Sequence, residues 1–447
     1  MNIDFLIDNF KKFSGNECIV WKSETLTYKD LLTLLEGASS FVTRNGISKG
    51  SVVALNGDFT PNSIALLFAL ILNDNIIVPF TKQEKESIGV KLEIAQAEFI
   101  INVNIGDDTF SIEKLRNKSE HEYYEKIRSL KVAGLVLFTS GTSGRPKAAV
   151  HNFQKLLKKF EKSRKSFRTI NFLLFDHWGG LNTLFNSLSN FSLVIPVLNR
   201  NPKNVCELIE KYKIQLLPVS PSFLNLLIIG ESFKDFDLNS LELITYGSEP
   251  MPESTLLKAQ LLFKNVKFQQ TYGLIELGVL RSKSKDDGSL WVKLGGEGYE
   301  LRVIDNLLEI KAESAMLGYL NAPSPFTEDG YFMTGDMVET NGEFFKILGR
   351  KSEIINVGGE KVYPQEVENL ILQYPGVKDV TVFGEKNAIM GNIVCANIFL
   401  EDIIDEKAIA KEIKFFCKQT LASFKVPVKV KIQTQPLFNN RYKKKRN

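Results

Sequence analysis

The amino-acid sequence predicts an α/β protein with two domains. Short apolar strands alternate with amphipathic helices along most of the chain, which favours parallel-rich sheets with crossover helices. From Asp286 the pattern changes to short β-rich pieces, and beyond Gly349-Arg350 a last unit has a strand and helix alternation of its own. We therefore expect a large domain over residues 1–349, which ends in a β-rich piece, and a small mobile α+β domain over residues 350–447.

Composition and charge limit the classes of function. The 447 residues are enough for two or three domains, and 56 basic against 52 acidic residues imply no bulk attraction to nucleic acid. Four scattered cysteines without a Cys-x-x-Cys pair, and only three histidines, argue against a structural zinc site. The N-terminus has acids where a signal peptide needs basic residues, and the longest apolar run, Ile64–Leu72, is nine residues. These features indicate a cytoplasmic protein without stable membrane insertion.

The first 130 residues alternate between helix and strand patterns. Thr27 opens an amphipathic helix that runs to about Arg44. The next elements expected are a strand, a helix and a second strand, at Val52–Leu55, Ser63–Leu72 and Ile76–Phe80. This order is typical of a parallel sheet, and it indicates no chemistry by itself.

A loop rich in hydroxyl groups follows the next strand. Leu135–Phe138 is apolar and is expected to be a buried strand of a parallel sheet. Thr139 to Pro146 contain four hydroxyls and two glycines, so hydroxyls and backbone N–H groups can surround an anion, and Lys147 adds a charge suited to phosphate. The residue order differs from that of a Walker A loop, and composition alone leaves open a flexible surface loop.

The alternation continues after this loop, and polar groups collect at the ends of strands. Helices are expected at Leu181–Leu188 and Val205–Tyr212, and strands at Phe172–Phe175, Ser192–Val197, Ile214–Val219, Leu241–Tyr246 and Val266–Thr271. Three of these strands lead into the segments Asp176-His177-Trp178-Gly179-Gly180, Gly247-Ser248-Glu249-Pro250 and Tyr272-Gly273-Leu274-Ile275-Glu276. Ligands of open α/β sheets bind at the carboxyl ends of strands, so these segments are candidates for the site.

The β-rich piece and the last unit complete the expected elements. Strands are predicted at Leu290–Leu294, Leu308–Ala312 and Glu343–Leu348, with a tight turn at Asn341-Gly342. Thr334-Gly335-Asp336 precede this hairpin and Gly349-Arg350 follow it. In the last unit we expect helices at Pro364–Leu372 and Glu406–Thr420, and strands at Asp379–Phe383, Ile393–Leu400 and Val426–Ile432.

The string Thr139-Ser140-Gly141-Thr142-Ser143-Gly144-Arg145-Pro146-Lys147 resembles the phosphate loop of the adenylate-forming superfamily. That superfamily includes acyl-CoA synthetases, peptide-synthetase adenylation domains and luciferases. Five motifs occur in the family order, and the resemblance covers essentially the whole chain. It implies that the phosphates of ATP are held by Thr139, Ser140, Gly141, Thr142, Ser143, Gly144 and Lys147. It also implies an adenine wall at Gly247, Ser248 and Glu249, an aromatic contact to adenine from Tyr272 beside Gly273, and a Mg²⁺ ligand at Glu276.

The later motifs imply the rest of the site. Asp336 would accept both ribose hydroxyls, and Arg350 would reach the ribose or a phosphate. Ser352 lies where the family has its hinge, and the loop with Gly358 and Gly359 would guide the thiol of CoA or of a phosphopantetheine arm. By the same resemblance, His177 borders and gates the acyl pocket, and Lys443 replaces the family's C-terminal catalytic lysine, whose Gly-Lys pair is Arg441-Tyr442 here.

Each of these positions also has a structural interpretation. Tyr272 and Glu276 fit a strand end with a buried aromatic ring and a solvated acid. Asp336 fits a turn acid, His177 fits a structural histidine, and Lys443 fits a solvated basic tail.

The resemblance implies an AMP-forming acid–thiol ligase of the acyl-CoA synthetase type, with a role in fatty acid metabolism. A carboxylate would attack ATP to give an acyl-adenylate, and CoA or an acyl carrier protein would then take the acyl group. Two alternatives stay open. Asp176 fits an amino-acid-activating enzyme that loads a carrier protein. Ile275, where the family has Thr or Ser, and the irregular tail fit a nucleotide-binding relative without catalysis.

Overall fold

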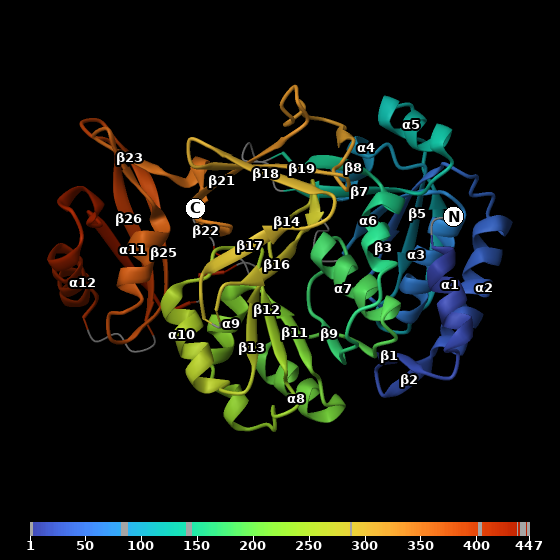
Figure 1. The fold of residues 1–447 in the computed structure, drawn as a ribbon, viewed down its shortest axis with the longest axis horizontal. Coiled ribbons are helices and arrows are strands. Elements are labelled where there is room, and N and C mark those ends of the chain that lie inside the picture. The colour runs from blue at the N-terminus through green and yellow to red at the C-terminus, as the bar shows by residue number, and fades with distance from the viewer. Residues whose placement is uncertain are drawn as a thin grey trace.

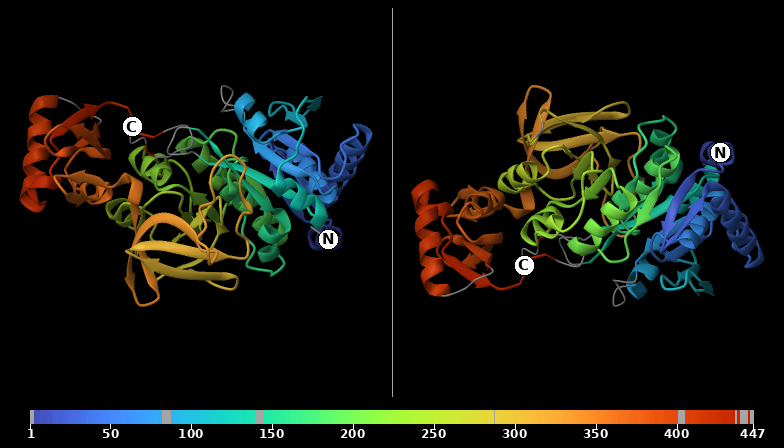
Figure 2. Two further views of the ribbon diagram at one scale, coloured as in Figure 1. Left: turned by 90° about the horizontal axis from the view of Figure 1, so that it is seen from above. Right: turned by 90° about the horizontal axis from the view of Figure 1, so that it is seen from below.

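The computed structural model describes residues 3–81, 88–139, 145–286, 288–400, 405–435, 437–438 and 444. The sheet that contains most of the N-terminal strands lies at one end of the molecule, and the small C-terminal domain lies at the opposite end (Figures 1 and 2). A second large sheet and a β-rich piece lie between them. This arrangement confirms the predicted α/β fold class with a large and a small domain.

The first large sheet has seven strands in the order β20-β8-β7-β4-β3-β5-β6. Its central strands β3, β4 and β5 are parallel and almost wholly buried, because helices cover them. The strands are β3 (Val52–Asn56), β4 (Ile76–Phe80), β5 (Phe99–Val103), β6 (Phe110–Lys114), β7 (Gly134–Thr139), β8 (Lys147–Asn152) and β20 (Gly318–Tyr319). The helices in this part of the chain are α1 (Asp4–Lys12), α2 (Tyr28–Arg44), α3 (Pro61–Leu72), α4 (Ile88–Ile94), α5 (Glu122–Leu130) and α6 (Phe153–Leu157).

The second large sheet also has seven strands, in the order β13-β12-β11-β9-β10-β1-β2. All neighbours are parallel except β1 and β2, which form an antiparallel pair at one edge. The strands are β1 (Glu17–Trp21), β2 (Glu24–Thr27), β9 (Thr169–Asn171), β10 (Val194–Pro196), β11 (Leu216–Val219), β12 (Leu243–Tyr246) and β13 (Lys267–Gln270). Its helices are α7 (Trp178–Ser189), α8 (Pro202–Tyr212), α9 (Pro221–Ile229) and α10 (Glu253–Leu262).

The apolar run at residues 64–72 forms most of helix α3, which lies in the hydrophobic core. Ten of the twelve residues of α3 are buried, and Phe68 packs edge-to-face on Phe185 of α7 at 5.6 Å and on Phe10 of α1 at 5.8 Å. A helix that is apolar on all sides is stable only when it is surrounded by protein or lipid. In the part of the chain that the structure describes, no helix has the length and apolar character needed to cross a bilayer.

The strand predicted at Phe172–Phe175 is wrong. The strand at this place is β9, which ends at Asn171, and the four apolar residues form an irregular segment before α7. The carbonyl of Phe172 accepts a hydrogen bond from Arg200 Nε at 2.7 Å rather than from a neighbouring strand. Phe172 packs on Phe223 at 4.3 Å and Phe175 packs on Phe59 at 5.1 Å, so the segment is apolar because it belongs to the core.

The β-rich piece is a six-stranded antiparallel sheet in the order β16-β17-β22-β21-β19-β18. Its strands are β16 (Arg281–Ser284), β17 (Trp291–Gly295), β18 (Tyr299–Ile304), β19 (Leu307–Ala312), β21 (Phe332–Asn341) and β22 (Phe344–Arg350). The two-stranded hairpin of β14 (Gly273–Leu274) and β15 (Gly278–Val279) comes just before it.

The small domain has one mixed sheet and a hydrophobic core of its own between Ile355 and Ile432. Its elements are β23 (Ile355–Val357), β24 (Glu360–Val362), β25 (Val377–Asn387), β26 (Gly391–Leu400), β27 (Lys429–Gln433), α11 (Pro364–Ile371) and α12 (Glu406–Thr420). A single 3₁₀ turn, Lys351–Glu353, joins it to β22.

One buried histidine is expected to make stability depend on pH. His151 in β8 is fully buried, and burial lowers the pKa of its ring to about 4, although backbone groups of Ile275 and Ser314 favour the charged form. In the unfolded chain the His151 ring binds a proton near pH 6.5, whereas in the folded protein it binds one only near pH 4. The free energy of unfolding therefore falls as the pH drops through this window.

We expect the free energy of unfolding to fall by about 2 kcal/mol more in the wild type than in His151→Leu between pH 7 and pH 5. Denaturant titrations of both proteins at the two pH values measure this difference. Equal losses in both proteins would contradict the buried, neutral state of His151.

Candidate active site

The predicted phosphate loop connects two antiparallel strands. Thr139, the last residue of β7, pairs directly with Lys147, the first residue of β8, so the two ends of the loop lie side by side. On its other side β7 pairs with β4 in parallel, as predicted, whereas the return strand β8 was not predicted. The loop residues Ser140, Gly141, Thr142, Ser143 and Gly144 lie outside the described residues. Their role in phosphate binding stays a prediction.

Glu276 lies at the tip of the β14–β15 hairpin, and its carboxylate is held by a tyrosine. The Tyr319 hydroxyl donates to Glu276 Oε1 at 2.6 Å, the short distance typical of a hydrogen bond to an ionised acid. The Lys147 ammonium lies over the Tyr319 ring at 5.4 Å from its centre. One tyrosine therefore contacts both the predicted metal ligand and the predicted phosphate-binding lysine.

Tyr272, Asp336 and Arg350 form a second group. The Tyr272 hydroxyl donates to Asp336 Oδ2 at 2.6 Å, and Arg350 Nε lies 3.3 Å from Asp336 Oδ1. Asp336 in β21 and Arg350 in β22 are direct partners across the hairpin, as their spacing around the predicted turn suggested. Gly335, with φ at +73°, takes a left-handed conformation that lets the Asp336 N–H donate to the Thr334 hydroxyl.

The charges of this region are coupled. Burial raises the pKa of Asp336, and the nearby Glu276 carboxylate adds to this, whereas Arg350 opposes both effects. Burial alone would lower the pKa of Arg350, but the carboxylates of Asp336 and Glu276 raise it above its ordinary value. Arg350 therefore compensates two acids at once, and its side chain stays half exposed. Such an arrangement keeps two carboxylates available for ligands in one place.

The predicted adenine wall follows β12. Gly247 lies where a Cβ atom would come within 2.4 Å of the Thr271 hydroxyl oxygen and 2.6 Å of the Thr271 carbonyl oxygen, so no larger residue fits between the ends of β12 and β13. Ser248 has a left-handed conformation with φ at +70°. Glu249 accepts hydrogen bonds from the backbone N–H groups of Ser222 and Lys444, at 3.0 Å and 3.2 Å. The turn is thus held at Gly247 by close packing on Thr271 and at Glu249 by hydrogen bonds to two backbone N–H groups.

His177 has a clear structural role. It is the N-cap of α7, where its ring Nδ1 accepts a hydrogen bond from the Gly179 N–H at 3.0 Å. The neighbouring Asp176 is buried. The gating role of His177 and the amine-binding role of Asp176 stay predictions.

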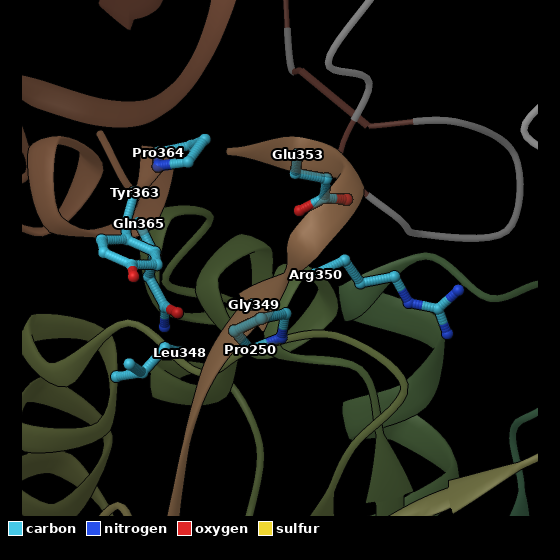
Figure 3. A pocket seen from close by; sticks show the side chains of 8 residues that line it. All are labelled: Pro250, Leu348, Gly349, Arg350, Glu353, Tyr363, Pro364 and Gln365. Atoms are coloured by element: carbon cyan, nitrogen blue, oxygen red, sulfur yellow. The ribbon is translucent and has the colours of Figure 1, made fainter. Parts of the chain in front are cut away.

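The predicted hinge region borders a small pocket between the large and the small domain (Figure 3). Leu348, Gly349 and Arg350 come from the end of β22, and Ser352 lies in the 3₁₀ turn that follows. Figure 3 shows the Arg350 side chain extended away from Tyr363 and Gln365. The residues that line the pocket are Pro250, Leu348, Gly349, Arg350, Glu353, Tyr363, Pro364 and Gln365. Gly358 and Gly359 form the tight β23–β24 turn, both with positive φ, at +58° and +94°.

The predicted lysine Lys443 lies outside the described residues, but its neighbour Lys444 is placed. Lys444 Nζ donates to the Val380 carbonyl at 3.0 Å and lies 3.2 Å from Glu368 Oε2 and 3.7 Å from Asp379 Oδ1. Its backbone N–H reaches Glu249 of the large domain. Lys444 is therefore bound to acids of the small domain, while its backbone N–H contacts the predicted adenine wall at Glu249.

Sequence reasoning missed Tyr319, Asn321 and Lys444. The segment 317–321 has no glycine-rich or charged pattern, and its importance comes from pairing with β8, far away in sequence. The signal available beforehand was a Gly-Tyr pair with a downstream Asn between two β-rich pieces, which is too short to indicate a site.

The residues present fit Mg²⁺ only as a partner of bound phosphates. Within the described ranges, no group of three or more His, Cys, Asp or Glu side chains is placed to hold a metal ion. Mg²⁺ in nucleotide sites is held by one or two carboxylates together with phosphates and waters, and Glu276 provides one such carboxylate.

Two family models match the chain. The model described as AMP-binding enzyme matches residues 7–332, and the model described as AMP-binding enzyme C-terminal domain matches residues 366–441. A long-chain-fatty-acid–CoA ligase of Bacillus subtilis is 22% identical over 504 residues, which cover 94% of this chain and 89% of the relative. A 2-succinylbenzoate–CoA ligase of Listeria innocua is 26% identical over 454 residues, with coverage of 94% and 92%.

Solved structures share the fold. The anthranilate CoA ligase AuaEII, in complex with anthranoyl-AMP, superposes with a TM-score of 0.83 at 19% identity and covers 99% of this chain and 95% of its own. ATP-bound MatB from Rhodopseudomonas palustris superposes with a TM-score of 0.78 at 20% identity, with coverage of 99% and 97%. At 19% and 20% identity, these two similarities establish a shared fold over almost the whole length of the chain.

Proposed function

Because the chain belongs to the AMP-binding enzyme family, we propose that it is an AMP-forming acid–thiol ligase, which activates a carboxylic acid with ATP and transfers the acyl group to CoA. The observation that carries this proposal is that Tyr319 joins Lys147 to Glu276, Asp336 joins Tyr272 to Arg350, and the charge of Glu276 acts on both Asp336 and Arg350. Lys147 comes from β8, Glu276 from the β14–β15 hairpin, and Asp336 and Arg350 from the β21–β22 hairpin, and ATP needs partners of their charges for its phosphates and ribose.

The proposed roles follow from charge and geometry. Asp336 accepts hydrogen bonds from the ribose hydroxyls, and Tyr272 and Arg350 fix the orientation of its carboxylate. Lys147 attracts the phosphates, and Glu276 presents a carboxylate to their Mg²⁺ ion. A Mg²⁺ ion held by Glu276 and the phosphates would neutralise phosphate charge, which would lower the repulsion of a carboxylate substrate. The protein contributes mainly position and charge compensation, and the reaction requires no nucleophile from the chain.

The acceptor step depends on the small domain. We propose a boundary between residues 349 and 350, with rotation at the 3₁₀ turn around Ser352, which agrees with the separate core of the small domain. The rotation would exchange the C-terminal tail for the Gly358-Gly359 turn beside the adenylate. CoA is preferred as the acceptor over a carrier-protein phosphopantetheine because the relatives reported above are named CoA ligases. The four cysteines, all free and buried, agree with a reducing cytoplasmic setting.

Pyrophosphate exchange tests this proposal. With ATP, Mg²⁺ and a panel of fatty, aryl and amino acids, we expect exchange above the acid-free background for a carboxylic acid without an α-amine. Asp336→Ala is expected to weaken ATP binding by about 1.5–3 kcal/mol, because it removes charged hydrogen bonds. Calorimetry measures this affinity, and Asp329→Ala, an exposed acid paired with Arg302, serves as the matched control.

The outcomes separate the alternatives. Exchange that appears only with amino acids would favour the amino-acid-activating alternative, with Asp176 in the pocket. ATP binding without exchange for any acid would favour a relative that has lost catalysis. Unchanged ATP affinity in Asp336→Ala would remove this residue from the site.

A further inference from the structure

Tyr319 occupies a position that the proposed roles above do not explain. Its ring and hydroxyl are buried, with 8% of the residue exposed, and they lie between Lys147 and Glu276. The Tyr319 hydroxyl donates to Glu276 Oε1 at 2.6 Å, so one oxygen of this carboxylate already has a partner within the protein.

The backbone around Tyr319 is hydrogen-bonded to β8, the strand that begins at Lys147. Gly318 and Tyr319 form β20, which pairs antiparallel with Val150 and Ala149 of β8. The Leu317 N–H donates to the Val150 carbonyl at 2.7 Å, and the Leu320 N–H donates to the Ala148 carbonyl at 2.9 Å. The backbone of Tyr319 is thus held beside the first residues of β8.

Asn321 fixes the residues on both sides of Lys147. Its Oδ1 accepts a hydrogen bond from the Ala148 N–H at 3.0 Å, and its Nδ2 donates to the Pro146 carbonyl at 2.8 Å. The close approach of this segment to the rest of the domain requires Gly318, since a Cβ there would come within 2.4 Å of the Tyr123 hydroxyl oxygen. Segment 317–321 is therefore a brace, held by backbone and side-chain contacts, that sets the start of β8.

We propose that Tyr319 is a positioning residue that holds the Glu276 carboxylate and the Lys147 ammonium in one fixed arrangement toward the Mg²⁺–triphosphate. The hydroxyl occupies Glu276 Oε1, so the carboxylate would have its other oxygen to offer to a Mg²⁺ ion. The ring face holds the ammonium, which keeps the cation next to the acid without an ion pair between them. Both charged groups thereby remain available to ATP. This inference rests on the proposed function.

Two substitutions separate the contributions of the hydroxyl and the ring. Tyr319→Phe keeps the ring under Lys147 and removes the hydrogen bond to Glu276, whereas Tyr319→Leu removes both. Tyr374→Phe is the matched control, because the Tyr374 hydroxyl donates to Glu412 at the same 2.6 Å in the small domain. Mutation of a group that orients a metal ligand typically costs about 10–100-fold in metal affinity.

The measurements are ATP affinity by calorimetry, with and without Mg²⁺, together with melting temperature and pyrophosphate exchange. For Tyr319→Phe we expect the Mg²⁺ concentration at half-saturation of ATP binding to rise by about 10-fold or more, with ATP affinity in the absence of Mg²⁺ unchanged. For Tyr319→Leu we expect the Mg²⁺-free ATP affinity to fall as well, because Lys147 loses its ring. In the Glu276→Gln background, Tyr319→Phe is expected to have no further effect on the Mg²⁺ requirement.

A Tyr319→Phe protein with the same Mg²⁺ requirement as the wild type and Tyr374→Phe would overturn this inference while the proposed function stands. An equal further loss from Tyr319→Phe in the Glu276→Gln background would also overturn it, because the hydroxyl would then act independently of the carboxylate. A wild-type protein that does not bind ATP would overturn the proposed function, and the role of Tyr319 with it.

Discussion

Replacement of Glu276 by glutamine is expected to lower the turnover of pyrophosphate exchange by about 10²–10³-fold, the loss typical of removing one electrostatic contact to a transition state. Glutamine keeps the size of the side chain, and its amide oxygen can still accept the Tyr319 hydroxyl. The substitution therefore removes the negative charge without emptying the space between Tyr319 and Arg350. The charge is what the proposed Mg²⁺ ligand contributes.

Turnover measured at saturating ATP and several Mg²⁺ concentrations tests this expectation. Glu313→Gln is the control, since Glu313 is an exposed acid paired with Lys158. Wild-type turnover in Glu276→Gln at limiting Mg²⁺ would show that Glu276 does not contact the metal. A large fall in melting temperature would instead indicate a structural role for the carboxylate beside Arg350.

A proline in the hinge is expected to abolish thioester formation while adenylate formation survives. Ser352 lies within the 3₁₀ turn, so proline there would force Lys351 out of its helical conformation. Position 351 accepts proline better, because Lys351 is the first residue of the turn and Arg350 before it is already extended, with φ at −91° and ψ at 141°. Lys351→Pro would therefore hold the turn in the conformation seen here.

The orientation that Lys351→Pro would hold has Lys444 and two further small-domain residues in contact with the large domain. Lys444 contacts Glu249, Gln365 Nε2 donates to the Met251 carbonyl at 3.3 Å, and Asn225 Nδ2 donates to the Lys378 carbonyl at 2.9 Å. A domain held in this way would keep Lys444 at Glu249 of the predicted adenine wall and would prevent the proposed rotation that brings the Gly358-Gly359 turn there. We thus expect the first half-reaction, and not the second, to persist.

Single-turnover pyrophosphate release set beside thioester yield with CoA measures the two half-reactions separately. Lys351→Ala removes the same side chain without restricting φ and serves as the control. Full thioester synthesis in a well-folded Lys351→Pro protein would refute rotation at this turn. Equal loss of adenylate and thioester formation with a lowered melting temperature would point to misfolding. A substitution at position 351 that restricts the backbone less than proline would then be needed.

The sequence predicted the parts of the site that local patterns determine. Asp336 and Arg350 were expected together because both flank one hairpin, and a hairpin brings its flanks into register. The polar segments after β12 and β13 were expected at one edge of a sheet, because the carboxyl ends of parallel strands meet there. Such predictions depend only on contacts between residues near in sequence, or between neighbouring strands of one sheet.

Tertiary structure alone decided the contacts between distant segments. The Tyr319 hydroxyl meets Glu276 across 43 residues, and Asn321 meets Ala148 across 173, because the short strand β20 adds to the edge of a sheet formed much earlier in the chain. A two-residue strand has no periodicity of its own, so its partner is chosen by the packing of the whole domain. For the same reason, Phe172–Phe175 has the apolar pattern of a strand, yet Arg200 takes the Phe172 carbonyl and ring packing buries the segment without strand pairing. Apolar patterns report burial, whereas the choice between a strand and an irregular core segment depends on which hydrogen-bonding partners the fold provides.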